Sequence, residues 1–232
     1  MSAFSPAFLK AEPGALRFLD DGFRHPSRRA EFVRQARARG VKAEVVSALR
    51  AQAARRPLTS ARETSLDALA GGAPVVVTGQ QVGLFLGPLY SLYKAATAVV
   101  TARALECVPV FWLQSEDHDF DEIAHTVVHG RDGALTKLSL ASPHVERASM
   151  SSVQLGAGVD EALSTLGAAL DGWPHADEVS ALFTRHYRPE ATWVTAFAGV
   201  LSELFPSLVI LDPRDEVLAR VARSVHERAL AE

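Results

Sequence analysis

The sequence has very little cysteine and no long apolar segment. Cys107 is the single cysteine among 232 residues, which excludes an internal disulfide and any metal site built from several cysteines. No run of about 18 apolar residues occurs, so no membrane-spanning helix is predicted. The first residues lack a basic stretch followed by an apolar run, so no secretory signal is expected. We therefore expect a cytoplasmic protein without a membrane partner.

Charge is unevenly distributed, although the formal net charge is only −3. Residues 1–70 contain 13 lysines and arginines against 7 acidic residues, whereas residues 71–232 contain 11 against 20. A basic segment can bind nucleic acid or an anionic ligand. Here the arginines alternate with alanines in helix-like runs, and no aromatic cluster accompanies them. This pattern favours a solvated helical face, and we expect no nucleic acid partner.

Residues 1–72 are expected to form an N-terminal helical extension. One helix is predicted to end at Gly40, because glycine is common just past the end of a helix. A second helix is predicted over 41–55. Ser60 and Glu63 have the spacing of a capping box, which predicts the start of a third helix.

Residues 73–232 are expected to form the core domain. Three short apolar runs have the composition of buried strands: 74–78, 108–113 and 208–211. A helix over about 88–106 connects the first two, which predicts parallel strands with a right-handed crossover. Residues 123–128 and 135–140 flank a glycine-containing turn and predict a small β-hairpin. Further helices are predicted at 159–171, 176–187, 191–205 and 213–230. The predicted fold class is α/β.

The segment after the first strand is a candidate binding loop, since parallel sheets bind ligands beyond the carboxyl ends of their strands. It contains three glycines: Gly79, Gly83 and Gly87. Their spacing matches neither a dinucleotide fingerprint nor a Walker A loop. They allow close approach of a ligand to the backbone, and the helix that follows favours an anion. Gln80 and Gln81 offer polar contacts, and Lys94 lies two turns into the helix.

The segment after the second strand is acidic. Residues 116–122 hold five carboxylates and one histidine, a crowding that is costly unless the groups are solvated, paired or bound to a cation. The pattern lacks the glycine and glutamate of a calcium-binding loop. Asp117 and Asp119 also match the D-x-D manganese site of nucleotide-sugar glycosyltransferases. A solvated acidic helix start is the simpler alternative.

The two segments together resemble the BshC family. The resemblance rests on TGQQVGLFLGPLYSLYKA at 78–95, on PVFWLQSEDHDFDE at 109–122 and on His125. It is dense over 74–129 and looser through 208–212. Members are assigned as cysteine ligases of bacillithiol biosynthesis. The resemblance implies a Rossmann-like parallel sheet core, related to nucleotidyltransferases and class I aminoacyl-tRNA synthetases, and a coiled-coil arm that mediates dimerisation.

The resemblance also implies an activity and a set of site residues. The assigned reaction joins cysteine to glucosaminyl malate through an amide bond, which requires an activated carboxylate and so implies ATP or another nucleotide, with Mg²⁺ as a candidate. Catalytic roles are expected for His118, Asp119 and Asp117. Substrate or nucleotide binding is expected at these positions: Thr78, Gly79, Gln80, Gln81, Gly83, Tyr90, Lys94, Ser115 and Glu116. No residue is assigned as a metal ligand.

Members of the family continue past the position that matches Glu232. We therefore expect an N-terminal part without the coiled-coil arm, and a homodimer for a full-length member rather than for this chain. Two other hypotheses stay open. One is a metal-dependent nucleotide-sugar transferase that uses Asp117 and Asp119. The other is an inactive fragment that binds a small ligand or a partner chain.

Overall fold

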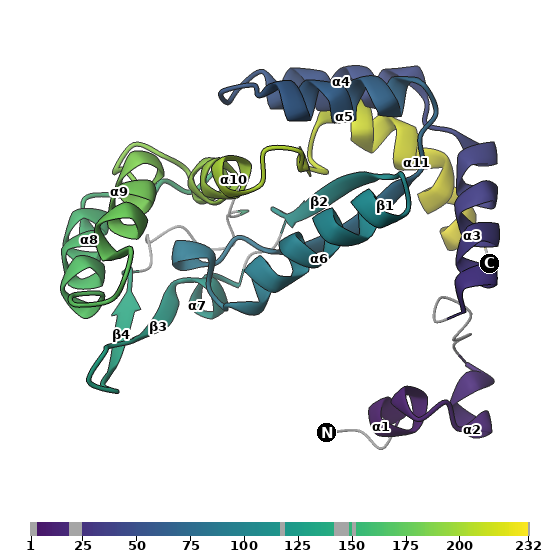
Figure 1. Ribbon diagram of the computed structural model, residues 1–232. Helices are drawn as coiled ribbons and strands as arrows, with labels where there is room; N and C mark the ends of the chain where they lie inside the picture. Colours follow the sequence, from purple (N-terminus) through teal and green to yellow (C-terminus); the bar gives the residue numbers. More distant parts are fainter. Residues whose placement is uncertain (1–3, 19–24, 117–118, 142–148, 150–151, 232) are drawn as a thin grey trace.

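A three-stranded parallel sheet lies at the centre of the computed structural model (Figure 1). The structure describes residues 4–18, 25–116, 119–141, 149 and 152–231. The strands are β1 (Val75–Gln81), β2 (Val108–Gln114) and β5 (Val209–Leu211), in the order β1-β2-β5. Both strand pairs are parallel, which confirms the predicted α/β class with a parallel sheet core.

Helices cover both faces of the sheet (Figure 1). On one face, α4 (Ala43–Ala53) and α5 (Ser60–Ala70) share a core with Val108 and Val110 of β2. On the other face, α6 (Tyr90–Ala104) and α10 (Trp193–Leu204) pack with residues of β2 that point the opposite way. Side chains alternate between the faces of a strand, so the uninterrupted apolar sequence of β2 fills both layers.

The strand β1 differs from the prediction of a buried strand over 74–78. It continues to Gln81, so the first residues of the predicted binding loop belong to the strand. It also has a paired strand on one side only, and Val75 and Val77 are 37% and 54% exposed. Apolar composition predicted the strand correctly but not its place at the edge of the sheet.

The N-terminal helices are α1 (Phe4–Leu9), α2 (Pro13–Leu16) and α3 (Pro26–Arg39). The predicted end of α3 at Gly40 is confirmed, and that glycine has a φ of 62°. The capping box at Ser60 is wrong, because the hydroxyl of Thr59 caps α5 by accepting from the Arg62 backbone N–H. The boundary between 1–72 and 73–232 stays a prediction, although α4 and α5 pack directly on the sheet.

A hairpin and four further helices complete the described part. The strands β3 (His125–His129) and β4 (Leu135–Ser139) pair antiparallel, as predicted. The remaining elements are the 3₁₀ turn η2 (Leu84–Leu86), α7 (Phe120–Ile123), α8 (Gly158–Ala169), α9 (Ala176–His186) and α11 (Glu216–Ala231). None of the described helices has the length and apolar character needed to cross a bilayer.

Candidate functional site

The carboxyl ends of the three parallel strands bring polar residues to one edge of the sheet. The strand β1 ends at Gln81, β2 ends at Gln114 before Ser115, and β5 ends at Leu211 before Asp212. This edge is where parallel sheets bind ligands. The two predicted segments therefore do follow neighbouring strands.

Three of the predicted binding residues contact one another at the end of β1. Gln80 is only 7% exposed, and its amide donates to the Tyr90 hydroxyl at 3.1 Å. The Lys94 ammonium donates to Gln80 Oε1 at 2.7 Å and to the Gly79 carbonyl at 3.3 Å, and it lies 5.1 Å from the centre of the Tyr90 ring. Lys94 thus folds back onto the strand and fixes the orientation of Gln80. Thr78 lines a separate cavity of about 310 Å³ beside Tyr90 and Lys94.

The two predicted segments meet through a side-chain contact. The Gln81 amide donates to Glu122 Oε2 at 2.8 Å. A cavity of about 400 Å³ lies beside this pair, lined also by Gly83, Tyr90 and His125. We call it the edge cavity. It collects residues of β1, α6 and the acidic segment.

Packing within the chain accounts for both predicted binding glycines. A Cβ atom on Gly79 would lie 2.6 Å from the carbonyl oxygen of Trp112 on the adjacent strand. A Cβ atom on Gly83 would overlap the carbonyl group of Gly87. Both positions therefore exclude a side chain whether or not a ligand binds, and a ligand role for them stays a prediction.

The connection between β1 and α6 is a tightly packed turn. Phe85 and Leu86 have φ angles of 48° and 60°, a left-handed conformation that costs roughly 1–2 kcal/mol for a residue with a side chain. The Phe85 ring packs against Phe183 and Tyr187 of the α9 region, with ring centres 5.3 and 4.8 Å apart. The buried Tyr187 hydroxyl donates to the Gly83 carbonyl at 3.3 Å, and burial raises the pKa of Tyr187. This packing holds the strained turn in place.

The acidic segment is only partly described. Asp117 and His118, two of the predicted catalytic residues, lie outside the described residues. Asp119 caps α7, because its carboxylate accepts from the Glu122 backbone N–H at 3.2 Å. Within the described ranges, no group of three histidine, cysteine or acidic side chains is placed to hold a metal ion.

Ser115 and Glu116 point in different directions. Glu116 is exposed, whereas Ser115 is fully buried and donates to Asp212 Oδ1 at 2.6 Å. Ser115 therefore joins the end of β2 to the end of β5, and its contact with a substrate stays a prediction.

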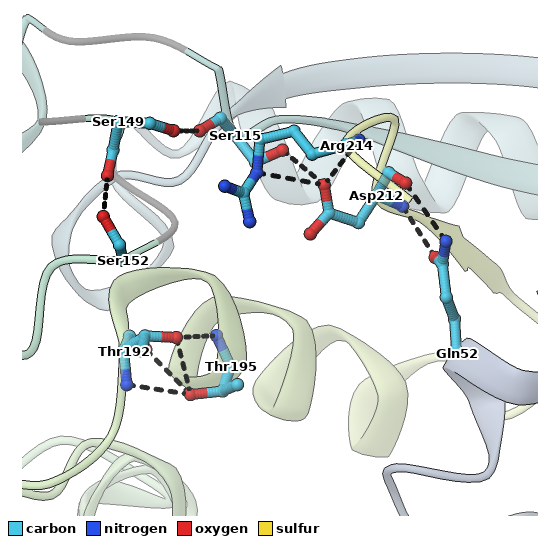
Figure 2. Close-up of polar contacts among 8 residues, drawn as sticks. All are labelled: Gln52, Ser115, Ser149, Ser152, Thr192, Thr195, Asp212 and Arg214. Carbon is cyan, nitrogen blue, oxygen red and sulfur yellow. Dashed lines mark hydrogen bonds and ion pairs between the residues drawn. The ribbon is translucent and has the colours of Figure 1, made fainter. Parts of the chain in front are cut away.

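Sequence reasoning missed Asp212, which is bound from three sides (Figure 2). Gln52 of α4 makes two hydrogen bonds to its backbone, at 2.8 and 3.1 Å. Its carboxylate accepts from Ser115 and from the Arg214 backbone N–H, the latter at 3.1 Å. One signal was available: Asp212 directly follows the third predicted strand, at the same position as the two segments that were singled out.

A further cavity also lay outside the prediction. It measures about 820 Å³ and opens beside Asp212, between the end of α4, the end of α9 and the start of α10. We call it the arginine cavity after five of its lining residues: Arg55, Arg56, Arg185, Arg188 and Arg214. No sequence spacing indicated it, because these arginines come from three separate parts of the chain.

The prediction that the arginines of the basic segment lie on a solvated helical face is wrong for Arg62. Arg62 is 1% exposed. Its guanidinium donates to the carbonyls of Leu208, Pro57 and Ser202 at 3.0, 3.1 and 2.6 Å. Burial lowers the pKa of Arg62. Tertiary packing has thus placed this arginine inside the protein, where it ties α5 to β5 and α10.

Comparison with known proteins agrees with this fold. Residues 2–232 match the family described as bacillithiol biosynthesis BshC, N-terminal Rossmann-like domain. The chain belongs to the BshC family. A BshC protein of Solibacter usitatus, named "Putative cysteine ligase BshC", is 34% identical in an alignment of 243 positions that covers 94% of this chain. Proteins of the same name from Chlorobaculum tepidum and Staphylococcus aureus strain Newman are 37% and 28% identical, over 65% and 82% of this chain.

These BshC relatives are much longer than this chain. The alignments cover 28% of the Chlorobaculum protein, 37% of the Staphylococcus protein and 44% of the Solibacter protein. The chain therefore spans less than half the length of these relatives.

Proposed function

We propose that this chain forms the Rossmann-like part of a ligase that joins cysteine to glucosaminyl malate in bacillithiol biosynthesis. Membership of the BshC family and the names of its relatives support the ligase class. The observation that carries the proposal is the hydrogen bond from Gln81 to Glu122, at 2.8 Å. It joins the two segments on which the resemblance depends and lines a cavity at the carboxyl edge of the sheet. The family match makes the nucleotide-sugar transferase the less favoured alternative.

The edge cavity has groups that suit an amine substrate. Amide formation makes a C–N bond between the activated carboxylate of cysteine and the amine of the glucosamine unit, which must first lose its ammonium proton. The Glu122 carboxylate and the Gln81 amide oxygen accept hydrogen bonds from such an ammonium group. His125 Nδ1 lies 3.0 Å from the Asp121 carbonyl. In the neutral ring that donates from Nδ1, Nε2 is left as an acceptor for the proton.

ATP or another nucleotide would supply the leaving group that activates the carboxylate. Its phosphates need cationic or N–H donors, and Lys94, which lines the separate cavity beside Thr78, is already bound to Gln80 and Gly79. Glu122 would repel a phosphate at the edge cavity. The arginine cavity offers the matching charge, so phosphate fits that cavity better than the edge cavity.

Binding of Mg²⁺ stays a prediction, as do the cytoplasmic location, the homodimer of a full-length member and the absence of a nucleic acid partner.

Ligation in the protein that contains this sequence tests the proposal. The protein is incubated with cysteine, glucosaminyl malate and ATP, and bacillithiol is measured by mass spectrometry. We expect His118→Ala and Asp119→Asn to lower turnover on the order of 100-fold, the loss typical of an acid–base or charge-stabilising group. Asparagine also caps helices well, so Asp119→Asn removes the charge and keeps the cap of α7.

Glu227→Gln provides the matched control, since Glu227 is an exposed carboxylate on α11. It should leave turnover unchanged. Turnover near that of the wild type in both His118→Ala and Asp119→Asn would refute their catalytic roles. Absence of product from the wild-type protein would refute the ligase proposal itself.

A further inference from the structure

The arginine cavity carries an excess of positive charge. Its lining contains five arginines and two carboxylates, Glu203 and Asp212. Glu203 forms an ion pair with Arg185, and its carboxylate Oε2 lies 2.9 Å from His186 Nε2. Asp212 is bound by Ser115 and Arg214, with Arg214 Nε 3.6 Å from its carboxylate. Both carboxylates are thus already engaged by other groups of the protein.

Arg55 and Arg56 have no carboxylate of their own. Neither side chain forms an ion pair with any residue that the structure describes. Arg56 Nε is buried and has no hydrogen-bond partner. A buried donor without a partner destabilises the protein, and more so when it is charged.

The surroundings of Arg56 increase this cost. Burial, followed by repulsion from Arg62 and Arg55, lowers the pKa of Arg56 to about 10, and Asp212 acts against this only in part. The Ser202 hydroxyl lines the same cavity and is also buried without a partner. Positively charged side chains and buried donors without a partner therefore line the same cavity.

The start of α10 is not the part of the arginine cavity that would bind an anion. Thr192 and Thr195 form a complete capping box there, in which each side chain accepts from the backbone N–H of the other (Figure 2). Figure 2 shows this closed turn below the Arg214 guanidinium, and both line the cavity. The guanidinium groups of Arg55 and Arg56, which form no ion pair with a described residue, are the donors left for an anion.

We propose that the arginine cavity binds a compact oxyanion that carries two or more negative charges, held by Arg55 and Arg56. Guanidinium groups bind carboxylate and phosphate oxygens in pairs, and about 820 Å³ lies in the range of small-molecule pockets. A phosphoryl chain and a dicarboxylate share this chemistry. The inference concerns binding alone and does not depend on the ligase reaction.

Isothermal titration calorimetry with two probes tests the inference. Inorganic pyrophosphate represents a phosphoryl chain and L-malate represents a dicarboxylate, each titrated at constant ionic strength. We expect saturable binding of at least one probe. Arg56→Gln and Arg55→Gln should each weaken that binding about tenfold or more, the effect of losing one charge-assisted hydrogen bond. If only one probe binds, that probe shows whether the cavity takes a phosphoryl chain or a dicarboxylate.

Arg223→Gln is the matched control, because it removes the same charge from the exposed face of α11. It should bind each probe within about twofold of the wild type, the level expected when only a distant, screened charge changes. Melting temperatures separate a binding role from a structural one. Without anion, Arg56→Gln should melt at or above the wild-type temperature, because repulsion is relieved. Added anion should raise the melting temperature of the wild type and of Arg223→Gln by more than that of Arg56→Gln.

The inference is wrong if neither probe shows saturable binding to the wild type. It is also wrong if both cavity variants bind the probes as tightly as the wild type, or if Arg223→Gln loses as much affinity as the cavity variants. If Arg56→Gln does not fold, the exposed Arg55 still decides the question, since its replacement removes no buried contact. A failed ligation assay with intact anion binding would refute the proposed function and leave this inference standing.

Discussion

Arg62 shows how one buried residue can organise distant segments. Its guanidinium satisfies three backbone carbonyls, two of them at least 140 positions away in sequence. We expect Arg62→Ala to lower the free energy of unfolding by about 3 kcal/mol or more, because three buried acceptors lose their donor. Urea unfolding measures the change. Arg34→Ala, at a 71% exposed side chain, should change stability by less than about 0.5 kcal/mol. Equal effects of the two variants would contradict this role of Arg62.

Glu203 predicts a dependence of stability on pH. Its hydrogen bond with Arg185, together with His186, lowers the pKa of Glu203. The folded state then binds fewer protons than the unfolded state. The stabilisation is fully present above the ordinary carboxyl pKa of about 4.3 and is lost as the pH falls through the lower folded value. Because the pair is partly exposed, we expect no more than about 1 kcal/mol.

Urea unfolding of Glu203→Gln from pH 7 to pH 3 checks this sign. The difference in unfolding free energy between wild type and variant should shrink towards the acid end. Glu227→Gln on α11 serves as the comparison for a solvent-exposed pair. A difference that grows on acidification would contradict the assigned contact.

At the scale of elements, the connection from β1 to α6 depends on a residue without a side chain at position 83. A Cβ on Gly83 overlaps the Gly87 carbonyl, so we expect Gly83→Ala to destabilise the protein by roughly 2 kcal/mol. Gly167 in α8 is the matched control, since a Cβ there meets nothing closer than the Ser180 hydroxyl at 3.9 Å. Gly167→Ala should stabilise by roughly 0.5–1 kcal/mol, because alanine favours helices. Thermal unfolding should show a lower melting temperature for Gly83→Ala and a higher one for Gly167→Ala than for the wild type. A Gly83→Ala variant as stable as the wild type would mean that the turn can adopt another conformation.

At the scale of the whole molecule, α4 and α5 are part of the sheet core. Val46, Leu49 and Leu66 pack with β2 and β5 residues, whereas α3 contains no buried residue. We expect a shortened chain of residues 41–232 to unfold cooperatively. A chain of residues 73–232 should lose cooperative unfolding, because one face of the sheet would be exposed to water. Circular dichroism during heating distinguishes the two, and a cooperative transition in 73–232 would support the boundary predicted at residue 72.

Most elements followed from local pattern, and most errors arose where packing competes with local preference. Both strands of the hairpin, the crossover helix and the end of α3 at Gly40 were predicted from periodicity and turn residues. Thr59, rather than Ser60, caps α5, since either hydroxyl can perform this role and only the path of the chain selects one. The strand β1 was predicted as buried because apolar composition does not reveal which strand lies at an edge.

The sequence by itself determined the α/β class, the parallel order of strand, helix and strand, and the two polar segments that meet through Gln81 and Glu122. These depend on short-range periodicity and on the rule that parallel strands share a carboxyl edge. Only the tertiary structure decided that Gln52 would bind Asp212, 160 positions away, and that arginines from three parts of the chain would surround one cavity. Such contacts depend on how helices pack across the sheet. That packing is set by the summed burial of many side chains, and no spacing within a single segment records it.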